Sequence, residues 1–176
     1  FSNEEVMQHF IDNCNDFESD NLLYYTCCYS SKNIIVQLIN KECKITDIES
    51  CVKGVIKTNL NKDVPFIVLY LLTYLDDAGI CFKLLKHACT RGILLKTKFL
   101  NNPEIECVDQ LINIIIDFII LHKQNIVLTK YYKYKISKSY NRAKINQFVN
   151  PKTLKRIKSL FSNLNKSEDY YDKNDS

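Results

Sequence analysis

The amino-acid sequence predicts an all-α protein built of stacked helical hairpins, with about nine or ten helices. The 176-residue chain contains only three glycines and three prolines, and 46% of its residues are hydrophobic. This composition favours long helices with short connections, and it disfavours nucleotide-binding folds that depend on glycine loops. Apolar residues also recur at helical spacing, most clearly at Ile34, Ile35, Leu38 and Ile39.

The N-terminal third predicts three helices. Ser2 and Glu5 have the spacing of a capping box, which indicates a helix over about 3–13. Its expected apolar face consists of Val6, Phe10 and Ile11. After a polar, acidic loop, two short helices over about 21–29 and 33–41 form the clearest helix–turn–helix unit of the chain.

Two further helices follow before residue 76. The segment Thr46–Glu49 is a second capping box, with Thr46 as the N-cap, so a helix is expected over about 47–58. Asp63 can cap the next helix. The apolar run Phe66–Leu75 indicates that this helix is the central buried one, and Gly79 just beyond it fits a left-handed C′ position.

The pattern then predicts a helical pair over about 80–90 and 93–101, with Gly92 at the turn. Asn102-Pro103 is a strong start signal for a long helix to about Lys123, although its many β-branched residues leave a buried strand as the alternative. Residues 125–147 are basic and rich in tyrosine, and they could be helical or extended. Asn150-Pro151 begins a last helix to about Leu164.

These elements suggest three parts. We expect a helical-repeat domain over residues 1–123, a basic C-terminal helical extension over 124–166 that packs on it, and a disordered acidic tail over 167–176.

The eight cysteines indicate an intracellular, reducing compartment, either cytoplasm or nucleus. They contain no CxxC pair, and most occupy apolar positions of helical patterns, so we expect free, buried thiols. The longest uncharged run, Val64–Leu75, is too short to cross a bilayer, so membrane insertion is not expected.

Asn21–Thr46 resembles an ankyrin repeat. Leu23 stands at the motif leucine, Thr26 and Cys27 at the small residues, and Ser30 at the glycine position. The two apolar pairs are Ile34 with Ile35 and Leu38 with Ile39, and the exit pair is Glu42 with Cys43. A second candidate unit contains Leu85, Ala88, Cys89, Gly92, Phe99 and Leu100. The T-P-L-H motif is absent, and the similarity extends over residues 21–102 at most. The resemblance implies binding of a protein partner, without chemistry.

No residue pattern predicts catalysis, a cofactor or a metal. His87 and Cys89 are two residues apart, so on one helix they point to different faces and do not form a zinc pair. The adjacent acids Asp76 and Asp77 are expected to lie in solvent or to cap the following element. We therefore expect no enzyme.

The charge distribution carries the strongest functional signal. Residues 119–167 contain twelve Lys or Arg and no Asp or Glu, whereas residues 1–118 have a net charge of −5. Three explanations remain open. The first is contact with nucleic-acid phosphates, with bases stacked on tyrosines. The second is docking on an acidic protein surface or on the acidic N-terminal part of this chain, and the third is a solvated basic face without a partner.

Two functions are therefore expected. The first is a non-catalytic protein-interaction scaffold, with a partner contacting exposed tips between helices at Ser31, Lys32, Asn59 and Asn61. The second is an RNA-associated assembly factor of the ribosome-biogenesis type that uses residues 123–158. The residues expected to bind nucleic acid or an acidic partner are Lys130, Tyr131, Tyr132, Lys133, Tyr134, Lys135, Lys138, Arg142, Lys144, Lys155 and Arg156.

Overall fold

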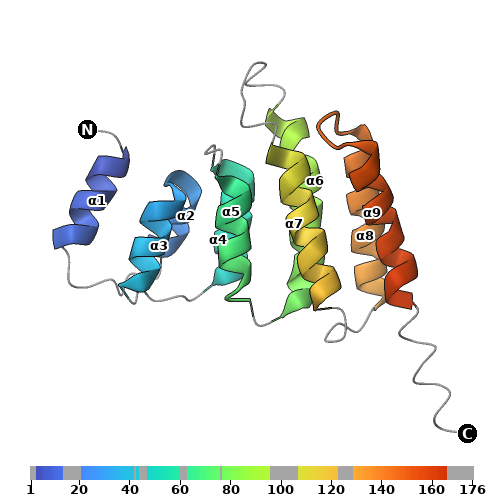
Figure 1. Ribbon diagram of the computed structural model, residues 1–176, viewed down its shortest axis with the longest axis horizontal. Coiled ribbons are helices and arrows are strands. Elements are labelled where there is room, and N and C mark those ends of the chain that lie inside the picture. Colours follow the sequence, from blue (N-terminus) through green and yellow to red (C-terminus); the bar gives the residue numbers. More distant parts are fainter. Residues whose placement is uncertain are drawn as a thin grey trace, which may run out of the picture. The chain divides into compact units, whose positions relative to one another are not determined.

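The computed structural model of the chain (Figure 1) describes residues 3–13, 21–41, 43, 47–59, 63–75, 77–95, 107–122 and 129–165. Within these ranges it contains nine α-helices, one short 3-10 helix and no strand, so the all-α prediction is confirmed. Contacts divide the chain into two compact units, Phe1–Leu75 and Asp76–Ser176, which we call unit 1 and unit 2.

Unit 1 contains five helices: α1 (Asn3–Asn13), α2 (Leu22–Tyr29), α3 (Lys32–Asn40), α4 (Ile48–Thr58) and α5 (Val64–Leu72). In Figure 1, α2 lies beside α3 and α4 lies beside α5. Helix α2 packs against both α3 and α4, α4 packs against α5, and α3 contacts α1 and α5. The core therefore draws on every helix, with fully buried side chains at Ile11, Cys27, Ile35, Leu38, Val52, Val55, Ile67 and Leu71.

Local start signals place these helices well, but two details differ from the sequence prediction. Asp47, and not Thr46, is the N-cap of α4, and its side chain accepts a 2.9 Å hydrogen bond from the Ser50 amide. The helix expected to be the central buried one, α5, buries residues such as Val64, Ile67 and Leu71, but Phe66 and Leu69 are each 46% exposed.

Asn59 corrects a prediction about the helix tips. The sequence suggested an exposed residue, but only 2% of Asn59 is exposed. As the C-cap of α4, it donates 2.8 Å hydrogen bonds from Nδ2 to the carbonyl oxygens of Cys27 and Ser30. These two acceptors lie at the C-terminal end of α2, where carbonyls lack partners within the helix. The side chain therefore joins α4 to α2 inside the protein.

Unit 2 contains a short 3-10 helix and four α-helices: η1 (Ala78–Ile80), α6 (Cys81–Leu95), α7 (Cys107–Leu121), α8 (Lys130–Ile145) and α9 (Pro151–Asn165). Helix α6 packs against α7 and α8, and α9 packs against α7 and α8. Fully buried side chains in this core include Phe82, Leu84, Leu85, Leu111, Ile115, Ile136, Ile157 and Leu160.

Both glycine-based predictions in this region are wrong. Helix α6 continues through Gly92 to Leu95, so no turn separates helices at 80–90 and 93–101. One glycine costs a helix only about 1 kcal/mol relative to alanine, and the buried apolar residues of α6 offset that cost. Gly79 is not a left-handed C′ residue. It lies in η1, where its amide donates a 2.7 Å hydrogen bond to the Asp77 carboxylate.

The C-terminal half follows the local signals closely. The β-branched segment near residue 115 is helical, and the uncertain basic segment forms α8. Asn150 precedes α9 and caps its first turn, because its Oδ1 accepts hydrogen bonds from the amides of Lys152 and Thr153. Helices α8 and α9 belong to the same compact unit as α6 and α7. The expected tail at 167–176, like the helix start at Asn102-Pro103, lies outside the described residues.

The described cysteines are free and buried, as the sequence predicts: Cys27, Cys28, Cys43, Cys51, Cys81, Cys89 and Cys107. Among the helices that the structure describes, none is long and apolar enough to span a membrane.

Candidate interaction surfaces

The solvent side of α8 brings together most of the basic and tyrosine residues predicted from the sequence. Tyr131 and Tyr134 are 47% and 52% exposed. Lys135 is half-buried, and Lys130, Lys138 and Arg142 are exposed. We call this set the basic–tyrosine face: Lys130, Tyr131, Tyr134, Lys135, Lys138 and Arg142. The opposite side of α8 is buried at Ile136, Ser139 and Ala143.

Each exposed tyrosine of this face is paired with a lysine one turn later. The Nζ of Lys135 lies 4.8 Å from the ring centroid of Tyr131, and the Nζ of Lys138 lies 4.8 Å from that of Tyr134. A hydrogen bond with Lys138 lowers the pKa of Tyr134, and the charges of Lys138, Lys135 and Lys86 lower it further. Lys86 belongs to α6, so the positive field extends beyond α8.

Two predicted residues of α8 have other roles. The ring of Tyr132 packs against Phe82 at a centroid distance of 4.9 Å, and burial is the main cause that raises the pKa of its hydroxyl. Lys133 is half-buried and engaged in a contact of its own. Neither side chain therefore belongs to the basic–tyrosine face. Lys144 is exposed near the end of α8.

Helix α9 joins α7 through a polar junction that contains Arg156. Its guanidinium donates to Asn113 and to the carboxylate of Asp117. Asp109 accepts from the Asn150 amide at 2.9 Å and from the Thr153 hydroxyl at 3.1 Å. Arg156 therefore holds α9 in place, whereas Lys155 is exposed on the same helix.

The predicted helix tips of unit 1 are not brought together as one surface. Ser31 is the half-buried N-cap of α3. The Nζ of Lys32 lies 5.9 Å from the ring centroid of Phe66 on α5, so this lysine packs over a neighbouring helix. Asn59 is buried, as described above, and Asn61 lies outside the described residues.

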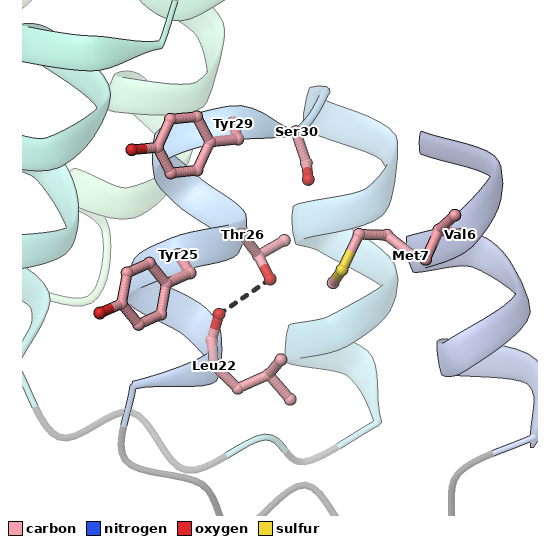
Figure 2. Close-up of a pocket in the computed structure, with 7 residues that line it drawn as sticks. All are labelled: Val6, Met7, Leu22, Tyr25, Thr26, Tyr29 and Ser30. Atoms are coloured by element: carbon pink, nitrogen blue, oxygen red, sulfur yellow. Dashed lines mark hydrogen bonds between the residues drawn. The ribbon is translucent and has the colours of Figure 1, made fainter. Parts of the chain in front are cut away.

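An apolar groove of about 240 Å³ lies between α1 and α2. Figure 2 shows the residues that line it, none of which is charged: Val6, Met7, Leu22, Tyr25, Thr26, Tyr29 and Ser30. The Thr26 hydroxyl donates to the Leu22 carbonyl at 2.8 Å, so it is satisfied within α2. The two tyrosines are the most exposed members, at 59% and 68%.

Sequence reasoning missed this groove. Val6 and Phe10 were expected on the buried face of α1, but they are 55% and 39% exposed, and only Ile11 is fully buried. The missed signal was the pair Tyr25 and Tyr29, four residues apart on one side of a short helix. Lys86 on α6 was also missed, because nothing local indicates that it lies near Tyr134.

We find no matching protein-family model, curated protein or solved structure for this chain. The resemblance to ankyrin repeats therefore stays an expectation based on residues 21–102. Among the described residues, no group of three or more His, Cys, Asp or Glu side chains is arranged to hold a metal ion.

Proposed function

We propose that this chain is a non-catalytic protein-interaction scaffold of helical hairpins, and that the α1–α2 groove receives an uncharged apolar side chain of a protein partner. The observation that carries this proposal is the exposure of Tyr25 and Tyr29 beside an uncharged apolar groove. Tyrosine is enriched in protein interfaces because a rigid ring offers a large contact area at low entropic cost.

The packing of unit 1 supports a rigid scaffold. Gly54 of α4 lies so close to α2 that an added Cβ would stand 2.7 Å from Cys28 Sγ. The buried Asn59 bonds join the same two helices. Helix α1 is attached to α3 by hydrogen bonds from Gln8 to Gln37 and from Lys41 to the Ile11 carbonyl. A preorganised surface loses less entropy when a partner binds.

The repeat character of the hairpins is part of this proposal. Asn21–Thr46 supports an ankyrin-like unit, since α2 and α3 match the two helices expected there. The continuous α6 argues against the second candidate unit at Leu85–Leu100, because an ankyrin-like unit needs a turn near Gly92. We therefore propose helical hairpins as the scaffold and retain ankyrin similarity only for the first unit.

The groove can be tested by replacing Tyr29 with lysine in the full chain. Proteins captured by the wild type are identified, one is purified, and its Kd is measured directly. We expect Tyr29→Lys to weaken binding at least about 10-fold, because it places a charge beside an apolar contact. Leu69→Lys on α5 is the matched control, since Leu69 is also an exposed apolar residue of unit 1. Equal affinity of the Tyr29→Lys variant and the wild type would exclude the groove.

RNA association is the second candidate function, and a separate observation favours it. The basic–tyrosine face of unit 2, which shares no residue with the groove, combines two exposed tyrosines with neighbouring cationic side chains.

A further inference from the structure

The basic–tyrosine face forms a continuous positive strip along α8. Lys130 and Arg142 are twelve residues apart, which corresponds to about 18 Å at 1.5 Å per residue. Between them lie two lysines and the two exposed tyrosines, all on the side of α8 away from the buried Ile136 and Ala143. The strip therefore offers several cationic groups and two ring surfaces to one extended ligand.

The charge of this strip is available to a partner. In the part of the chain that the structure describes, Lys130, Lys135, Lys138 and Arg142 pair with no carboxylate. Three acids of unit 2 are engaged elsewhere. Asp77 accepts from the Gly79 amide, Asp109 binds Asn150 and Thr153, and Asp117 binds Arg156.

The tyrosines make the strip more than a cluster of charges. Tyr131 and Tyr134 are each about half exposed, and an ammonium group lies over each ring. An aromatic base that stacks on such a ring displaces the ammonium group, which then becomes available to a neighbouring phosphate. Lys86 of α6 adds a further cation close to Tyr134.

Other anionic partners fit the face less well. A membrane-binding helix needs an apolar side to insert among lipid chains, but the apolar side of α8 is buried in the core of unit 2. An acidic protein would use the lysines and has no particular need for exposed rings. We propose that the basic–tyrosine face binds single-stranded nucleic acid, with the cations on backbone phosphates and Tyr131 and Tyr134 stacked on bases.

The test measures binding of the full chain to fluorescent 16-nucleotide oligo(U) RNA and oligo(dT) DNA by anisotropy, over about 50 to 200 mM salt. The five cations are Lys86, Lys130, Lys135, Lys138 and Arg142. At about −0.7 for each phosphate contact, they predict a slope of log K against log[salt] of roughly −3.5. In Lys135→Gln/Lys138→Gln/Arg142→Gln, we expect the slope to fall to roughly −1.4. In Tyr131→Ala/Tyr134→Ala, we expect at least about 10-fold weaker binding with the salt slope retained.

The matched control is Lys152→Gln/Lys155→Gln/Lys158→Gln, which removes the same charge from exposed positions of α9. It should change affinity much less than the α8 variant. Equal loss in both triple variants, or full affinity in the double tyrosine variant, would overturn the proposal. Binding of a glutamate 16-mer peptide as tight as that of oligo(U) would indicate an acidic-protein site and would also overturn it. These outcomes are independent of the Tyr29→Lys result, so each proposal can fail alone.

Discussion

The side-chain amide of Asn59, at the end of α4, donates a 2.8 Å hydrogen bond to the carbonyl of Cys27, 32 residues earlier on α2. Unit 2 contains a counterpart. Asn146, at the end of α8, donates a 2.9 Å hydrogen bond to the carbonyl of Cys89 on α6. Both asparagines are buried C-cap residues. Each bond therefore joins a helix to the helix two places earlier in the chain, α4 to α2 and α8 to α6.

Replacing Asn59 with alanine should lower the free energy of unfolding by about 2–4 kcal/mol, since two buried carbonyls lose their donor. Urea unfolding followed by circular dichroism measures this change. Asn33→Ala on α3 is the control, because Asn33 is exposed and its loss should leave stability nearly unchanged. A similar stability for Asn59→Ala and the wild type would show that the amide does not hold α4 to α2.

Replacing Asn146 with alanine should have a related but smaller effect. This side chain donates one bond to Cys89, and its Oδ1 accepts from the Phe148 amide at 3.1 Å. We expect a loss of about 1–3 kcal/mol in the unfolding free energy. Asn141→Ala on the exposed side of α8 is the comparison. If both variants unfold at the same urea concentration, the buried hydrogen bond makes no net contribution to the free energy of unfolding.

Replacing Gly54 with alanine should destabilise unit 1, although alanine is the better helix former. The added Cβ would stand 2.7 Å from Cys28 Sγ and 3.1 Å from a ring carbon of Tyr24. We expect a loss of about 1–3 kcal/mol from overpacking. A double-mutant cycle with Cys28→Ala measures the cause, since removal of the sulfur should relieve part of the loss. Strict additivity of the two changes would mean that this contact is not responsible.

Stability should fall in alkaline solution because of buried thiols. Burial is the main cause that raises the pKa of Cys81 from 9.0 to about 12. The unfolded chain therefore loses this proton first, and the unfolding free energy should fall by about 1.4 kcal/mol per pH unit for this group between about pH 9 and 12. Below pH 9 its contribution should be constant. Urea titrations of wild type and Cys81→Ala at several pH values compare the slopes, and identical slopes would exclude Cys81 as a source.

The two candidate surfaces differed in how far the sequence could reveal them. Lys130, Tyr131, Tyr134 and Arg142 stand in one acid-free segment, so composition alone indicated them. Composition could not separate Tyr132, which packs on Phe82, from its neighbours, because the outcome depends on where α6 lies. The groove also needs Val6 and Met7 of α1, so the pair Tyr25 and Tyr29 by itself could not reveal it.

By itself, the sequence determined that the protein is helical and where many helices begin, because these properties depend on neighbours within one or two turns. The cap at Asn150 and the spacing of Ile34 and Leu38 are examples. The tertiary structure alone decided that α6 passes through Gly92, and that the side chains of Asn59 and Arg156 join helices. The hydrogen bonds of Asn59 and Arg156 reach residues about 30 to 40 positions away, and no local pattern records such contacts.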